Sequence, residues 1–277
     1  MGRDPGVAEA LDEWIDEHWR ADATLAEWWQ ALADSGYAFP HWPSGLGGCG
    51  WSTADSAAVH TALGARSVIG PPVGNAPNMG VPTVLAHGTE EQQQRFVLPV
   101  ANGTHSWCQL FSEPGAGSDL ASLSCRAVRD GDHFVVTGQQ VWSSSADTSE
   151  WGMLLARTGS GASRHEGITW MMLDMRQSGV EVRQLVQMNG GADFCEVFIT
   201  EALVPVDNVI GSIGDGWNVA RTTLAFERAT VGRRYPKGMV IARAGTLGGH
   251  VQRQVATIVE DARRAAKNPS KRFDVMV

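Results

Sequence analysis

The period of the hydrophobic residues changes twice along this 277-residue chain, and no other feature constrains its fold as strongly. Over roughly the first hundred residues, apolar side chains recur every three or four positions, as on one face of an amphipathic helix. From about His105 the period falls to two, in short segments bounded by turns, and after Gly211 helical spacing returns. The sequence therefore predicts helices, then strands, then helices. Helical spacing is clearest at Leu11, Trp14, Ile15 and Trp19, and at Leu25, Trp28, Trp29 and Leu32.

The middle segment is predicted to form an antiparallel sheet. Asp130-Gly131 separates two alternating runs, which is the strongest short-range signal for a β-hairpin. Further strand-like runs follow at short intervals, and close spacing favours antiparallel pairing over a parallel sheet with crossover helices. These runs are WGMLLAR, GITWMMLDM, VEVRQLV and CEVFIT.

The predicted fold class is α+β with several domains. We expect an N-terminal helical domain over residues 1–104, a middle antiparallel β domain over 105–212, and the start of a C-terminal helical bundle over 213–277. The last region has apolar faces for only about two helices, the second of them a long helix from Val240 to Ile258. Two such faces cannot cover each other alone, so this bundle is incomplete and must pack on other domains, a partner or a further segment.

The overall charge is acidic, at −8 with an isoelectric point near 5.5. This balance argues against general affinity for nucleic acid or an anionic membrane surface. The N-terminus lacks a basic-then-apolar signal pattern, and no apolar run reaches the roughly 20 residues of a membrane span. The four cysteines (Cys49, Cys108, Cys125 and Cys195) have no metal-site spacing and fit a reducing compartment. We therefore expect a cytoplasmic protein without a membrane span or bound metal.

A glycine-rich segment, WCQLFSEPGAGSDL from Trp107 to Leu120, resembles a dinucleotide fingerprint only superficially. It lacks the third glycine and the helical continuation that the fingerprint needs. Its turn exposes backbone N–H groups and hydroxyls, which suits a phosphate or the edge of an electron-rich ring. The alternative is an ordinary tight loop between strands.

A second unusual segment is GQQVWSSSAD, from Gly138 to Asp147. Trp142, followed by three serines at a strand end, can place an indole beside a flat ligand with hydroxyls near its heteroatoms. The alternative is a core tryptophan before a polar turn.

Glu227 is the candidate base. It shares a helical face with Ala220, Leu224 and Val231, so a carboxylate stands where an apolar residue is expected. Its neighbour Arg228 projects elsewhere and is not an obvious ion-pair partner. The alternative is a structural carboxylate that pairs with another arginine.

Taken together, these segments resemble the acyl-CoA dehydrogenase family. The resemblance runs in collinear order to about Leu247 and includes Pro82–Gly103, Asp207–Trp217 and the TTLAFER that contains Glu227. It implies an N-terminal helical domain, a middle β domain and a C-terminal bundle. It also implies FAD as cofactor and removal of hydrogen from the α and β carbons of an acyl-CoA thioester.

The resemblance also implies roles for individual residues. Glu227 takes the α proton, as in the isovaleryl-type branch, while flavin N5 accepts the hydride; Arg228 lies near the coenzyme A region. Serine replaces the threonine of many relatives at two of the flavin positions, which keeps the hydroxyl and loses the methyl group. Gln109, Phe111 and Ser112 would lie at the pyrimidine end of the ring, Gly117 and Ser118 near flavin and thioester, and Trp142 and Ser144 beside the ring and N5.

The resemblance ends in the C-terminal region. The glycine-rich segment that contacts the FAD of a neighbouring subunit in relatives is absent, so the chain is interpreted as a shortened member that binds FAD weakly by itself. The partners implied are acyl-CoA, an electron-transfer flavoprotein or other acceptor, and a homo- or hetero-oligomer. A non-catalytic or fragmentary subunit, and an acyl-CoA oxidase or flavin monooxygenase, stay open as alternatives, as do acyl chain length and branching.

Overall fold

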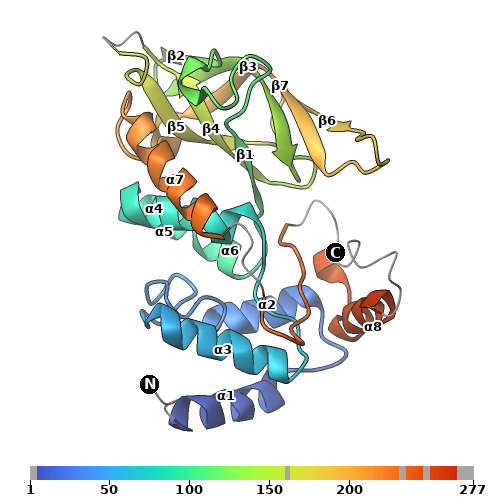
Figure 1. The fold of residues 1–277 in the computed structure, drawn as a ribbon. Helices are drawn as coiled ribbons and strands as arrows, with labels where there is room; N and C mark the ends of the chain where they lie inside the picture. The colour runs from blue at the N-terminus through green and yellow to red at the C-terminus, as the bar shows by residue number, and fades with distance from the viewer. Residues whose placement is uncertain (1–4, 160–162, 231–234, 246–249, 267–277) are drawn as a thin grey trace. The chain divides into compact units, whose positions relative to one another are not determined.

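A computed structural model describes residues 5–159, 163–230, 235–245 and 250–266 (Figure 1). The chain divides into two compact units, which we call the helical unit and the sheet unit. The helical unit consists of Met1–Pro77, Gln94–His105 and Gly232–Val277, and the sheet unit of Asn78–Gln93 and Ser106–Val231. These units are defined by packing, so the predicted boundaries at residues 104 and 212 stay a prediction.

The helical unit is built around tryptophans of the N-terminal helices. Thr24 and Glu27 form a capping box at the start of α2, and the indoles of Trp28 and Trp29 donate hydrogen bonds to the carbonyls of Ile69 and Gly70. This confirms the apolar face predicted for Leu25–Leu32, because these side chains are buried. The helices are α1 (Pro5–His18), α2 (Leu25–Asp34), α3 (Thr53–Ala65), α6 (Leu98–Ala101), the short η4 (His250–Gln252) and α8 (Val255–Ala266).

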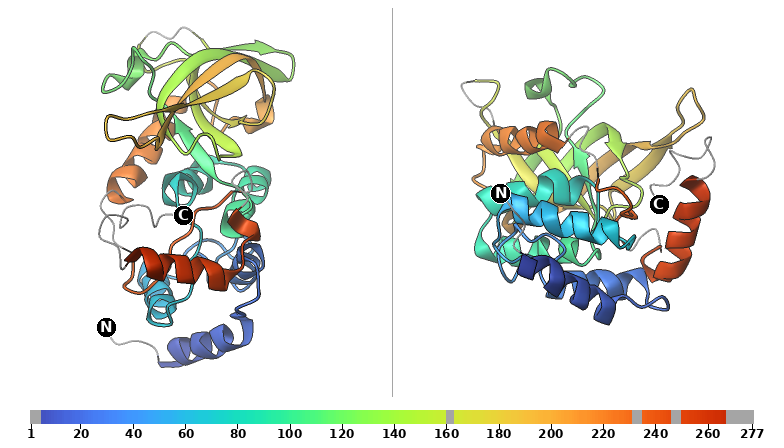
Figure 2. Two further views of the ribbon diagram at one scale, coloured as in Figure 1. Left: turned by 90° about the vertical axis from the view of Figure 1, so that its right-hand side faces the viewer. Right: turned by 60° about the horizontal axis from the view of Figure 1, so that its bottom comes forward.

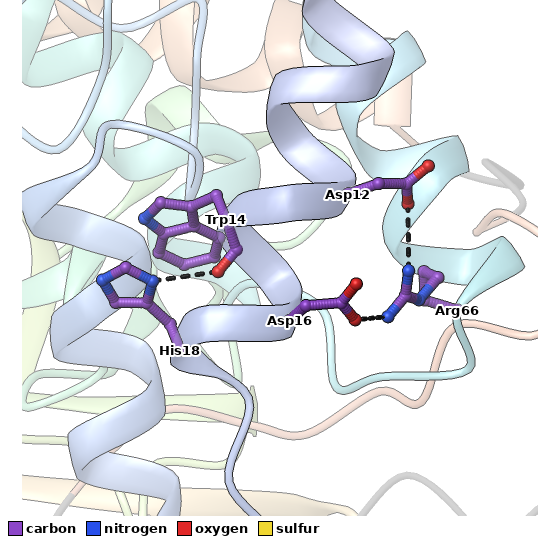
Figure 3. A network of polar contacts seen from close by, with 5 residues as sticks. All are labelled: Asp12, Trp14, Asp16, His18 and Arg66. Atoms are coloured by element: carbon purple, nitrogen blue, oxygen red, sulfur yellow. Dashed lines mark hydrogen bonds and ion pairs between the residues drawn. The ribbon is translucent and has the colours of Figure 1, made fainter.

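An arginine just beyond α3 fixes α1. Arg66 forms ion pairs with Asp12 and Asp16, which lie four residues apart on one face of α1 (Figure 3). On the same helix the rings of Trp14 and His18 stack, with their centroids 4.5 Å apart. The α1–α3 pairing is thus polar at its rim and apolar inside, where Leu11 and Ile15 are buried.

The prediction of a long helix that starts at Val240 is wrong for the described residues. Residues 240–245 are not helical but contain isolated β-bridges at Val240 and Arg243, and the helix α8 begins only at Val255. Val240 and Ala242 instead form strand-like backbone hydrogen bonds with Val68, Gly70 and Val73, and Ala242 and Ala244 are buried. A helical period in six residues cannot distinguish these two modes of burial. Leu247, which the prediction included, lies outside the described residues.

The sheet unit is a strongly curled seven-stranded sheet (Figures 1 and 2). Its strand order is β1-β4-β2-β3-β7-β6, with β5 paired to β4. The predicted hairpin at Asp130-Gly131 is confirmed by β2 and β3, and most pairs are antiparallel, but β1 and β2 both run parallel to β4. The strands are β1 (Trp107–Leu110), β2 (Arg126–Asp130), β3 (His133–Ser144), β4 (Trp151–Arg157), β5 (Ile168–Asp174), β6 (Val180–Leu185) and β7 (Phe194–Pro205).

Two helices of the sheet unit, α4 (Val81–His87) and α7 (Gly216–Thr230), pack together and fix the position of Glu227. Thr83 and Thr223, both fully buried, are joined by a 3.0 Å hydrogen bond, and His87 and Thr222 by one of 2.8 Å. A Cβ at Gly216 would collide with the backbone of β5, so glycine lets the start of α7 approach the sheet.

The remaining short elements connect these parts. The sequence Thr89-Glu90-Glu91-Gln92 predicts a capping box at the start of a short helix. The helix α5 (Glu90–Phe96) confirms this prediction, because Thr89 and Gln92 exchange hydrogen bonds. The other turns are η1 (Ala76–Gly80), η2 (Leu120–Ser122) and η3 (Val206–Asn208). Among the described helices, none has the length and apolar character that crossing a membrane requires.

Candidate functional site

Strand β1 presents one polar side chain to the helix-covered face of the sheet. Cys108 and Leu110 are fully buried, and Gln109 between them is half-buried and points to the opposite face. Its partner in β4 is the buried Met153. A Cβ at Gly80, which precedes α4, would meet the Met153 sulfur, so this face is closely packed beside Gln109.

The two segments singled out in the sequence lie side by side. The Val141 N–H of β3 donates to the Ser112 carbonyl at 2.8 Å, which joins the glycine loop to the strand carrying Trp142. Phe111 is buried and Ser112 half-buried. Two regions that are about 30 residues apart in sequence are therefore one local structure in space.

A buried carboxylate that the sequence analysis did not single out shapes the glycine loop. Glu113 is 6% exposed, and its oxygens accept hydrogen bonds from the Ser124 N–H (2.8 Å), the Ser124 hydroxyl (2.7 Å) and the Cys125 N–H (2.7 Å). Its own N–H and carbonyl pair with Ala116, which closes the turn. The available signal was an acidic residue immediately before the Pro-Gly-Ala-Gly turn.

Beyond this turn the loop is open. A Cβ placed on Gly115 or Gly117 would meet no atom within 4 Å, so the fold itself does not require glycine there. Ser118 is exposed, and Asp119 forms an ion pair with Arg164. The hydrogen bond from Arg164 holds the pKa of the Asp119 carboxyl below its usual value.

Arg157, which the sequence analysis also did not single out, joins the glycine loop to the connection between β4 and β5. The guanidinium of Arg157 donates to the carbonyls of Ala121 (3.0 Å), Leu123 (3.4 Å) and Glu166 (3.2 Å). It thereby ties η2 to the β4–β5 connection. An arginine ending an apolar strand carries no sequence signal for this role.

Trp142 occupies a strained and exposed position. The pairing of β3 with β7 is irregular between Gln140 and Ser143, and Trp142 within this bulge has a φ of 62° and is 61% exposed. Its indole meets the Phe194 ring edge-on, with centroids 6.0 Å apart. Ser144 beside it is half-buried. Trp142 is therefore not the core residue that the alternative interpretation required.

Glu227 contacts the first of the predicted flavin residues. Gln109 Nε2 donates a hydrogen bond to Glu227 Oε2 at 3.1 Å, across 118 residues of sequence. Glu227 is half-buried, one turn beyond the buried Thr223 on α7. No ion pair joins Glu227 to a Lys or Arg side chain in the described part of the chain, and Arg228 is exposed.

The residues fit a flat aromatic cofactor. An indole held out of the core at a strained φ, a glycine loop with free space above it, and the hydroxyls of Ser112 and Ser144 lie on adjoining segments. Aromatic faces and hydroxyl groups are the contacts that a ring with polar edges needs. In the described residues, no group of three or more His, Cys, Asp or Glu side chains is arranged to hold a metal ion.

Comparison with known proteins gives the family. The family model for the acyl-CoA dehydrogenase N-terminal domain matches residues 6–104, and that for the acyl-CoA dehydrogenase middle domain matches residues 108–202. The chain thus belongs to the acyl-CoA dehydrogenase family, which confirms the resemblance drawn from its motifs. Its helix–sheet–helix order, with an incomplete C-terminal helical region, also agrees with that fold.

Individual relatives are similar over most of this chain. IpdE1, an acyl-CoA dehydrogenase of Mycobacterium tuberculosis, is 41% identical over 242 residues, covering 86% of this chain and 59% of that protein. The solved Tcur3481-Tcur3483 steroid ACAD has 27% identity and a TM-score of 0.64, covering 99% of this chain and 72% of that one. The ChsE4-ChsE5 complex of M. tuberculosis has 27% identity and a TM-score of 0.62, covering 82% and 61%.

The chain spans less than two thirds of the length of the curated relatives that it matches, for example 59% of IpdE1. The activity, substrates and partners of the whole protein are accordingly treated as proposals below.

Proposed function

We propose that this chain carries the flavin- and thioester-facing residues of an FAD-dependent acyl-CoA dehydrogenase. The observation that carries the proposal is the placement of Glu227. A half-buried carboxylate without a described cationic partner accepts a hydrogen bond from β1, the strand that leads into the glycine loop. Family membership supports the reaction class.

Glu227 is the proposed base for the α proton. A carboxylate can remove this proton if it is fixed over the α carbon and is not neutralised by a neighbouring cation. Burial of Thr223 and its bond to Thr83 fix the helix one turn before Glu227. Arg228 is exposed and available for phosphates of coenzyme A, and Ser118 is available for the thioester side.

Residues of the glycine loop and the β3 bulge are proposed to hold FAD. Bound FAD supplies the acceptor, at N5, for the hydride that leaves the β carbon. Gln109, Phe111 and Ser112 would lie at the pyrimidine end of the ring, with Gly117 and Ser118 close to it. Trp142 would cover the ring edge, and Ser144 would hydrogen-bond near N5.

Relatives suggest a substrate class and an assembly. Because one similar structure is a steroid ACAD, we propose an acyl-CoA whose acyl group is attached to a steroid as the first substrate to test. A complex with a second family member is proposed from ChsE4-ChsE5, in place of a monomer. An electron-transfer flavoprotein is the proposed acceptor of the electrons, and the expected cytoplasmic location stays a prediction.

The test is anaerobic mixing of the purified protein, with any co-purifying chain, against a panel of acyl-CoA thioesters. The panel contains straight, branched and steroid-linked acyl groups. We expect bleaching of flavin absorbance and an enoyl-CoA product with at least one of them. Peroxide formed stoichiometrically in air would favour the oxidase alternative. Bound flavin that no thioester bleaches would favour the non-catalytic subunit.

A further inference from the structure

We propose that the side chain of Gln109 is a positioning residue for Glu227, and does not bind the flavin. This inference rests on the proposed function, because it assigns Gln109 a role in orienting the base. It also revises the expectation that the polar groups of Gln109 serve the cofactor. Only the backbone groups of Gln109 then remain available to the flavin ring.

The contact itself has a definite polarity. An ionised carboxylate only accepts hydrogen bonds, so the amide nitrogen of Gln109 must face Glu227. The two atoms are 3.1 Å apart, a normal distance for such a bond. Both side chains are half-buried, so water competes with the bond less than it would at the surface.

Both partners stand on rigid supports. Gln109 lies between the fully buried Cys108 and Leu110, in the strand paired with β4. Glu227 follows the buried Thr223 by one turn of α7. A hydrogen bond between two fixed elements holds the Glu227 carboxylate in one rotamer. Without this bond the side chain could sample several rotamers.

A neutral donor suits a base better than a cation does. An arginine or lysine at position 109 would also orient Glu227, but its positive charge would stabilise the carboxylate and weaken it as a proton acceptor. The neutral amide of Gln109 orients the Glu227 carboxylate without placing a positive charge beside it. A half-buried glutamine that donates to a carboxylate without a described cationic partner therefore suits a positioning role.

The test compares Gln109→Leu with the unchanged protein, purified with any co-purifying chain. We expect flavin reduction about 10- to 100-fold slower, because the carboxylate loses its fixed direction. FAD content, flavin absorbance and the Kd for acyl-CoA should be unchanged. Gln109→Asn, one carbon shorter, should behave like the leucine variant. The matched control is Gln139→Leu, which removes a glutamine-to-carboxylate bond with Glu196 on β3 and β7 and should react normally.

The Glu227→Gln background separates this inference from its rivals. If Gln109 acts through Glu227, adding Gln109→Leu to Glu227→Gln should slow the reaction no further. Lower FAD affinity or shifted flavin absorbance from Gln109→Leu in both backgrounds would overturn the inference in favour of flavin binding. Normal flavin reduction by Glu227→Gln would instead overturn the proposed base. A slow Glu227→Gln with a fast Gln109→Leu would overturn the positioning role alone.

A second readout does not depend on FAD. In apoprotein labelled with ¹⁵N at glutamine side chains, the Gln109 amide signal is identified by its loss in Gln109→Leu. We expect this signal to shift in Glu227→Gln, while that of Gln139 does not. An unshifted Gln109 signal would contradict the contact.

Discussion

Trp142 shows how one residue can act against the stability of its own fold. A non-glycine residue at a φ of 62° is disfavoured by about 1–3 kcal/mol, and a 61% exposed indole recovers little of this through burial. The edge-on contact with Phe194 offsets only part of the cost. Strained residues cluster at ligand sites, which is consistent with the proposed ring-binding role.

Replacing Trp142 with glycine should separate strain from function. Glycine adopts positive φ freely, so Trp142→Gly should be at least as stable as Trp142→Ala, which keeps the strain and loses the ring. Both variants should bind FAD at least about tenfold more weakly, as measured by flavin fluorescence titration. Unchanged FAD affinity in both would remove Trp142 from the cofactor site.

The buried thiols of the sheet unit predict a pH dependence of stability. Burial raises the pKa of Cys108 and Cys125 from 9.0 to about 12. The unfolded chain therefore releases these protons first, so the stabilisation is complete below pH 9 and is lost as the pH rises towards 12. Guanidinium unfolding at several pH values should show a steeper fall for the natural chain than for a variant with alanine at both positions. Parallel slopes would contradict this.

At the scale of elements, the glycine loop depends on Glu113. Glu113→Ala removes an acceptor of three hydrogen bonds and leaves the N–H groups of Ser124 and Cys125, between η2 and β2, without this acceptor. We expect a loss of about 2–4 kcal/mol in the free energy of unfolding. The control is Glu181→Ala, which breaks an exposed ion pair with Arg183 and should leave the free energy of unfolding nearly unchanged. Equal effects would show that Glu113 does not hold the loop.

Elements with a local signal were predictable from the sequence, and those set by distant pairing were not. The hairpin at Asp130-Gly131 and the cap at Thr89 depend on neighbouring residues, and both are confirmed. The parallel pairing of β1 with β4, and the extended pairing of Val240 beside Ile69, depend on residues far along the chain. Tertiary contacts override a local period in such cases.

The residues of the candidate site were likewise only partly predictable from the sequence. Local sequence pattern and motif resemblance were enough to select Trp142 and Glu227 as candidates. They could not reveal that Glu113 is buried under its own loop, or that Gln109 reaches Glu227 across 118 residues. The contact between Gln109 and Glu227 depends on how α7 and β1 pack in the sheet unit, and pairing at that distance leaves no trace in a single sequence.

At the scale of the whole molecule, the proposed assembly makes a separate prediction. If a second family chain completes the cofactor site, FAD per chain should be low for this chain alone and approach one when the partner is co-expressed. Size-exclusion chromatography with light scattering and flavin absorbance measures both quantities. Full, tightly held FAD in a monomer would contradict the proposed assembly and the weak binding expected from the sequence.

The central claim is that Glu227 takes the α proton of an acyl-CoA thioester. The most direct measurement is anaerobic single-turnover flavin reduction by Glu227→Gln, with a thioester that bleaches the natural protein. The glutamine keeps the size and a hydrogen-bonding oxygen but cannot act as a base at neutral pH. We predict intact FAD binding and bleaching slowed by at least about 1,000-fold, within the range seen when a general base is lost. Bleaching at the natural rate would contradict the account and place the base elsewhere.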